Sequence, residues 1–212
     1  MHQKALINPR VWAIITMLCP VLLLLMLFIV APFVPNFDPV RSLISVLSLG
    51  QFGWLGVTFF ILSAITVLAF ARGISGSIPL NKKSKNALTL LYSTAVCLLL
   101  LIFIDIDHVH GIWTLKRVVH WAIASAAIGF FSVSCFLIMD NLKEDAAWQG
   151  MYVFTIVMAV LTIAIGAGLA FAVRSGLTGL LERLILASAV IWVEVMSVRI
   201  YQLSRRDEAG RR

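Results

Sequence analysis

Acidic and histidine side chains suited to metal binding or acid–base chemistry gather in one short stretch of the chain. Asp105, Asp107, His108 and His110 lie close together, and His120 follows ten residues after the last of them. Imidazole and carboxylate groups are common zinc ligands, so His108, His110 and His120 could bind a divalent metal such as zinc. The same stretch could instead be a hydrated polar loop, with His120 acting as a general base toward a ligand or as a structural hydrogen-bond partner.

A second set of ionisable residues lies in the last long apolar stretch. Glu182 and Arg183 stand at its start, and Glu194 lies near its middle with Arg199 five residues further on. Five residues of helix span about 7–8 Å, so Arg199 would pair imperfectly with Glu194 and is expected to extend toward the membrane interface. A carboxylate at that depth is costly unless it is paired, protonated or hydrated. Glu194 is therefore either a neutral hydrogen-bonded residue or part of a proton relay.

The segment near residue 40 contributes a third polar group. It contains Asp38, Arg41 and Ser45, and Pro39 follows Asp38 directly. Proline is favoured at the first position of a helix, so we expect a short helix that begins at Asp38 and Pro39. Ser45 would be a candidate nucleophile only if it lay beside the histidines and aspartates, since the chain has no nucleophile elbow, P-loop or HExxH motif.

The amino-acid composition indicates whether these residues lie in a soluble protein or in a membrane protein. Hydrophobic residues make up 61% of the 212 residues and charged residues 13%, whereas soluble domains have about 45–50% and about 25%. A chain this apolar is typical of a membrane protein. Its net charge of +7 sits in short connections between apolar stretches, which indicates contacts with anionic lipid and a defined topology. We therefore expect membrane lipid as a partner and no nucleic acid.

Six stretches are long and apolar enough to cross a bilayer whose hydrocarbon core is about 30 Å thick. We predict spans at about 12–34, 54–71, 87–104, 118–139, 148–173 and 177–203, which form a single transmembrane domain over 1–212. The first is much longer than the apolar part of a signal peptide, so we expect it to be retained. The predicted fold class is all-α, a polytopic membrane protein with a six-transmembrane-helix bundle.

The distribution of basic residues predicts the orientation of these spans. Eleven lysines and arginines lie on the side of the two termini and four on the opposite side. Because basic residues favour the cytoplasmic side, the N- and C-termini are expected to be cytoplasmic in a multi-pass protein of the cell (plasma or inner) membrane. The opposite, outer face then collects a polar cluster: Asp38, Arg41, Ser45, Asp105, Asp107, His120, Glu182 and Arg183.

Small residues at four-residue spacing predict where helices approach each other closely. Such pairs occur in the fourth and fifth spans: Ala122 with Ala126, Ser125 with Gly129, and Ala164 with Gly168. In lipid, small side chains at this spacing allow two helix backbones to pack together. We therefore expect these faces to point into the bundle.

Three pieces of the sequence together resemble a known family. They are Asp38-Pro39-Val40-Arg41 leading to Ser45; Asp105 and Asp107 followed by Thr114 and His120; and Gly179-Leu180-Leu181-Glu182-Arg183 with Trp192 and Arg199. The chain resembles the prokaryotic membrane family called domain of unknown function 998 over nearly its whole length. It departs from that family in having Asp-Ile-Asp at 105–107 and Lys116-Arg117. The resemblance implies six spans and a shared outer polar cluster, and it brings no established activity.

Three functional hypotheses follow from the residues. The first is a membrane protein whose outer polar pocket binds a lipid headgroup or a small ligand. The second is a metal-dependent hydrolase or transferase acting on a lipid, with zinc held by the histidines and aspartates. The third is a small proton-coupled transporter that uses Glu194 and the outer cluster. The sequence leaves open whether the protein is an enzyme.

Overall fold

The computed structural model describes residues 8–79, 81–104, 114–172 and 175–210. Within these ranges the regular structure is helical, in agreement with the all-α prediction. The long helices are α1 (Pro9–Ile29), α2 (Gly53–Ser75), α3 (Lys82–Leu100), α4 (Leu115–Glu144), α5 (Met151–Ala172) and α6 (Thr178–Ala209). Short 3-10 helices occur at η1 (Ala31–Phe33), η2 (Ile44–Ser48), η3 (Gly50–Phe52) and η4 (Ala146–Trp148).

Polar side chains just before the helices explain where several of them begin. Asn8 accepts a hydrogen bond from the backbone N–H of Arg10 at the start of α1, and Pro9 occupies the first helical position. Asn81 and Thr114 cap α3 and α4 in the same way. A helix leaves its first N–H groups without internal partners, and a side-chain oxygen at the cap satisfies one of them.

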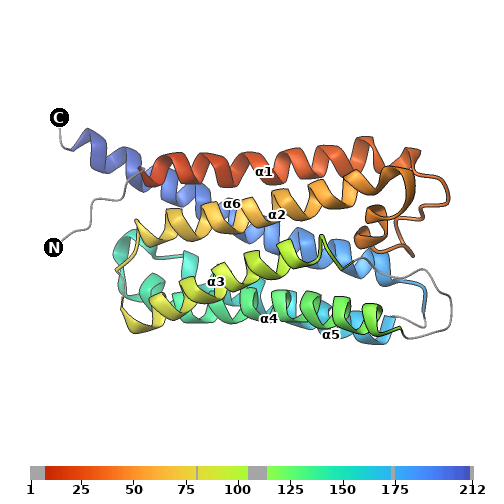
Figure 1. Ribbon diagram of the computed structural model, residues 1–212. Helices are drawn as coiled ribbons and strands as arrows, with labels where there is room; N and C mark the ends of the chain where they lie inside the picture. The colour runs from red at the N-terminus through yellow and green to blue at the C-terminus, as the bar shows by residue number, and fades with distance from the viewer. Residues whose placement is uncertain (1–7, 80, 105–113, 173–174, 211–212) are drawn as a thin grey trace.

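The long helices form a ring in sequence order. Each one packs against the helices before and after it, and α6 closes the ring by packing against α1 and, to a smaller extent, α2. Figure 1 shows that both termini lie at one end of the bundle, here called the terminal end. The connection from α1 to α2 lies at the other end, which we call the capped end.

Five of the described helical segments are long and apolar enough to cross a membrane. They contain α1, α2, α4, α5 and α6. Each of the six predicted spans overlaps one helix, but α3 is not among the five. It begins at Lys82 rather than near residue 87, and three lysines lie within its first turn, which lowers the hydropathy of the helix.

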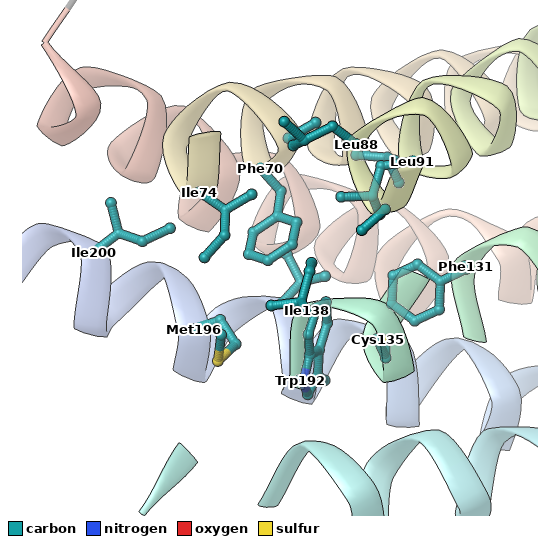
Figure 2. Close-up of a cluster of buried hydrophobic side chains, with 14 of the residues drawn as sticks. Phe70, Ile74, Leu88, Leu91, Phe131, Cys135, Ile138, Trp192, Met196 and Ile200 are labelled. Atoms are coloured by element: carbon teal, nitrogen blue, oxygen red, sulfur yellow. The ribbon is translucent and has the colours of Figure 1, made fainter. Parts of the chain in front are cut away.

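The terminal half of the ring is filled by a large apolar cluster (Figure 2). At its centre the ring of Trp192 makes edge-on contacts with Phe70 and Phe131, with centroids 5.0 and 5.5 Å apart. The indole N–H of Trp192 donates to Thr155 Oγ1 at 3.0 Å, so this buried ring also satisfies its polar atom. These contacts tie α2, α4, α5 and α6 together at this level.

The close helix approach predicted for the small residues of the fourth span is not found at three of them. Ala122, Ser125 and Gly129 are exposed on the surface of α4, and no atom lies within 4 Å of the position of a Cβ added at Gly129. Close approaches of this kind occur elsewhere, for example where Gly56 of α2 packs directly on Ser48 of η2.

Candidate functional site

The chain between α1 and α2 folds over the capped end of the ring. Residues 38–48 form what we call the capping segment, which is docked along the first turns of α6. Leu180 N–H donates to Val40 O at 2.9 Å, and Thr178 Oγ1 donates to Arg41 O at 2.7 Å. Arg183 Nη1 donates to Ser42 O at 3.1 Å. The first of these bonds satisfies an N–H group that the start of a helix leaves unpaired.

A glycine makes this docking possible. A Cβ added at Gly179 would lie 2.8 Å from Pro39 O and closer still to Ser42 O. Both are backbone atoms, so neither can move aside without displacing the capping segment. The glycine is thus required by close contact between two backbones, which agrees with its place in the motif that carries the family resemblance.

Glu182 fastens the next part of the capping segment. The backbone N–H of Ile44, at the start of η2, donates to Glu182 Oε2, and an interaction with the Ser45 backbone adds to it. No side chain within η2 caps this helix. Glu182 therefore serves as a cap from a distant part of the chain.

Asp38 and Arg41 shape the turn that precedes η2. Asp38 Oδ1 accepts from Val40 N–H at 2.8 Å, Ser42 N–H donates to Asp38 O at 2.7 Å, and Arg41 Nε lies 3.6 Å from Asp38 Oδ2. The predicted helix beginning at Asp38 is wrong: the chain makes a hydrogen-bonded turn there, and the helix comes later, over η2. The ion pair is largely exposed and contributes little stability.

Arg183 binds backbone and an aromatic ring rather than a carboxylate. Its Nη1 also donates to Gly179 O at 2.8 Å, and its guanidinium lies 5.3 Å from the centre of the Phe37 ring. Arg183 thereby joins α6 to the chain on both sides of the turn. The structure thus brings Asp38, Arg41, Glu182 and Arg183 into one region, and their described contacts hold the capping segment in place.

His120 is buried, with 4% of its surface exposed, and it begins the inner face of α4. Its Nδ1 lies 2.6 Å from Ile104 O. Because a carbonyl oxygen only accepts, Nδ1 carries a hydrogen and donates it to Ile104 O. A histidine that binds a metal commonly donates its other N–H in this way.

The remaining residues of the predicted metal site, Asp105, Asp107, His108 and His110, lie outside the described residues. In the part of the chain that the structure describes, no group of three or more histidine, cysteine, aspartate or glutamate side chains is arranged to hold a metal. The zinc hypothesis therefore stays a prediction.

Beneath the capping segment the ring contains a partly open cavity of about 200 Å³. All six long helices contribute to its lining, and most of the lining side chains are apolar. Ser45, His120 and Glu182 line it at the capped end, while Phe131 and Val193 line it near the aromatic cluster of Figure 2. His120 and Phe131 are eleven residues apart on α4, so the cavity extends about 16 Å along the bundle.

The hydroxyl groups along the cavity are mostly satisfied within the protein. Thr66 Oγ1 donates to Leu62 O at 2.8 Å, and Thr94 Oγ1 donates to Leu90 O at 2.9 Å. Thr162 Oγ1 is bonded to Met158 O. Threonine bonded to its own helix offers its methyl group, so the wall is largely apolar at these positions. Ser63 also lines the cavity, and its Oγ has no hydrogen-bond partner among the described residues.

Glu194 and Arg199 lie apart from this region, in the terminal half of α6. Arg199 donates from Nε to Ala147 O at 2.8 Å, and Nη2 bonds to the same oxygen. Arg199 thus anchors the connection between α4 and α5 instead of pairing with Glu194. Among the described residues, no hydrogen-bond partner is in reach of Glu194 Oε1, which is buried.

Sequence reasoning missed several residues that hold the terminal end together. Asn141 Nδ2 donates to Pro79 O at 3.1 Å, and Trp148 Nε1 donates to Ser77 O at 3.3 Å. A signal was present, because an asparagine late in an apolar stretch is costly unless it is bonded. These contacts join the two connections at the terminal end.

Comparison of the chain with curated proteins and with solved structures finds no match. A family model does match, over residues 17–199, which include the cavity, His120, the Gly179–Arg183 motif and Arg199. The chain therefore belongs to the family described as protein of unknown function (DUF998).

Proposed function

We propose that the protein binds a membrane lipid or a similar amphipathic ligand, with the apolar chain in the cavity and the polar head at the capped end. The observation that carries this proposal is the contrast along one cavity. Its wall is mostly apolar and carries only scattered hydroxyl groups, whereas the ionisable lining residues His120 and Glu182 lie together with Ser45 at one end. A ligand with one polar and one apolar end matches such a site.

The length of the cavity supports a chain from one leaflet of the membrane. About 16 Å is close to half of a hydrocarbon core of about 30 Å. The capping segment covers the polar end, and the aromatic cluster around Trp192 fills the other half of the ring. A lipid tail that entered between the helices would therefore end near the middle of the bilayer.

The proposal places all six helices across the membrane, including α3. Its 19 residues extend about 28 Å, and it packs between α2 and α4 as each of the other helices packs between its neighbours. The lysines of its first turn would extend to the interface. With the basic terminal end in the cytoplasm, the capped end faces outward, in the plasma or inner membrane.

Two substitutions on α4 test whether the cavity holds a chain. Ala127 is buried and lines the cavity, whereas Val133, on the same helix, is 47% exposed. We expect Ala127→Phe to lower the affinity of the purified protein for a fluorescent fatty acid by tenfold or more, because the added ring fills the cavity. Val133→Phe should leave the affinity within twofold of the wild type.

Mass spectrometry of lipids that co-purify with the wild type provides an independent measurement. We expect a stoichiometric lipid that is reduced in Ala127→Phe and retained in Val133→Phe. Equal binding by both folded variants, in both measurements, would show that the cavity is not the site.

A further inference from the structure

Two buried polar groups share one face of α6 outside the cavity. Glu194 Oε1 and Ser197 Oγ are both buried, and neither has a hydrogen-bond partner in the part of the chain that the structure describes. Ser197 has no exposed surface at all. Residues three apart on a helix lie on the same face, so these groups border one small region. Buried polar atoms in a folded protein are rarely left unpaired, which indicates that something occupies or bonds this region.

The same face of α6 turns toward α1. Tyr201 lies one turn beyond Ser197, and its hydroxyl is bonded to Arg10 Nη2 at 3.2 Å. Arg10 belongs to α1, and its guanidinium also lies 5.1 Å from the centre of the Tyr201 ring. Glu194, Ser197 and Tyr201 are three and four residues apart, so they lie on the same face of α6. Because Tyr201 contacts Arg10 of α1, this face is the one that packs on α1.

Helix α1 offers an acceptor at the matching depth. Pro20 lies inside α1 and has no N–H, so the carbonyl of the buried Thr16 lacks its usual helical donor. Ile200 and Trp12 lie at one level, because both approach Gly73 of α2 within 3.6 Å of an added Cβ. The two helices are antiparallel (Figure 1). Thr16 follows Trp12 by four residues, or about 6 Å along α1, and Glu194 precedes Ile200 by six residues, or about 9 Å along α6. Both distances run toward the capped end, so Thr16 and Glu194 lie at similar depth in the bundle.

Arg199 and Arg10 are bonded to other groups, and Arg72 is exposed on the surface. On α6, Arg199 is bonded to Ala147 O. The titratable groups on the helices packed against α6 are Arg10 and Cys19 of α1, Arg72 of α2 and Tyr152 of α5. Arg10 is held by Glu208 and Tyr201. An ionised carboxylate can only accept hydrogen bonds, whereas a carboxylic acid can donate one.

We propose that Glu194 binds a proton and that, with Ser197 and the Thr16 carbonyl, it forms a proton-binding site between α6 and α1. The acid donates its O–H to an acceptor of this site, and its proton comes from water at the terminal end. Val193 lines the lipid cavity, but Glu194, Ser197 and Thr16 do not, so variants at Glu194 and Ser197 test proton binding separately from the proposed lipid binding.

Infrared spectroscopy of the full-length protein in lipid tests this site. In the wild type at neutral pH we expect the carbonyl band of a protonated carboxylic acid, which is absent in Glu194→Gln. Glu208→Gln, which changes an exposed carboxylate paired with Arg10, should keep the band. Glu194→Gln should also unfold at the same temperature as the wild type or above it, because it replaces a neutral acid with a neutral amide.

Two further variants test the acceptors. Pro20→Ala restores an N–H that competes for the Thr16 carbonyl, so at least one of Pro20→Ala and Ser197→Ala should shift the acid band to higher frequency. If Glu194→Gln does not fold, Glu194→Asp should move the band instead of removing it. A wild-type spectrum without a band that responds to changes at Glu194 would overturn the proposal, and so would a band unmoved by both acceptor variants.

Discussion

The carboxylate of Glu182 accepts the backbone N–H of Ile44, although the two residues are 138 positions apart in the chain. Ile44 has no exposed surface, so this N–H group cannot turn to water. The bond fixes η2 over the cavity, and the same carboxylate belongs to the cavity lining. Glu182 thus connects two properties of the protein, the closure of the capped end and the polarity of the site beneath it.

Removing the Glu182 carboxylate should destabilise the capped end. In Glu182→Ala the Ile44 N–H is left buried without an acceptor, which costs about 1–3 kcal/mol. We expect a lower free energy of unfolding in detergent and faster thiol labelling of a cysteine placed at Leu47, which is buried in the wild type. Glu182→Gln should recover part of the loss, because its amide oxygen still accepts.

Glu144→Ala is the matched control for this change, since Glu144 is an exposed glutamate at the terminal end. It should unfold as the wild type does. If Glu182→Ala and Glu144→Ala proved equally stable and equally slow to label, Glu182 would not hold the capping segment.

A methyl group at Gly179 should push the capping segment away from α6. The added carbon would overlap the backbone oxygens of Pro39 and Ser42, and such overpacking costs about 1–3 kcal/mol. We expect Gly179→Ala to be destabilised by that amount and to label faster at a cysteine in place of Leu47, as measured by thiol labelling and unfolding in detergent.

Gly129→Ala is the control, because the same substitution is expected to have the opposite effect on stability there. It lies within α4, where an added Cβ meets no atom within 4 Å, and alanine is more favourable than glycine in a helix by roughly 0.5–1 kcal/mol. This variant should be as stable as the wild type or more stable. A Gly179→Ala protein that behaved like Gly129→Ala would contradict the close contact between capping segment and α6.

The helices and the gathering of polar residues were predictable because their causes are local or general. Long apolar stretches form helices in lipid, since backbone groups there must bond within the segment. The cost of charge in hydrocarbon is the reason to expect Glu182 and Arg183 near other polar groups, and the structure places them against Ser42 and Ile44.

The individual contacts between α6 and the capping segment were not predictable from the sequence. The acceptors on the capping segment are backbone carbonyls of Val40, Arg41 and Ser42, which every residue type carries. The cavity is equally invisible in sequence, because it is a volume that side chains from all the helices leave unfilled. The error over Ser125 and Gly129 has a related cause: in lipid both the inner and the outer face of a helix are apolar, so small residues do not reveal which face is inside.

Zinc analysis separates lipid binding from the metal-dependent alternative. Under the proposed function we expect purified protein without stoichiometric zinc, and an unfolding temperature unchanged by a chelator. The alternative predicts one zinc per chain that is lost in His120→Ala. Loss of the Ile104 bond makes His120→Ala less stable in either case, so the metal content and not the stability is the deciding measurement.

Accessible cysteines test the orientation and the crossing of α3 together. In a chain whose native cysteines are replaced, a membrane-impermeant thiol reagent added to intact cells should label Val40→Cys and Ser175→Cys, which lie in the α1–α2 and α5–α6 connections. It should not label Gln149→Cys, in the α4–α5 connection, until the cells are opened. This pattern follows from the excess of lysine and arginine at the terminal end.

The two ends of α3 decide whether the helix spans the membrane. Lys85 lies in its first turn, and the exposed Leu115 begins α4. If α3 crosses, Leu115→Cys is labelled from outside and Lys85→Cys is not. Labelling of both residues, or of neither, would leave five crossings and put the termini on opposite sides. Because His120 lies near the start of α4, which is a candidate span, the labelling of Leu115→Cys also decides which face of the membrane His120 occupies.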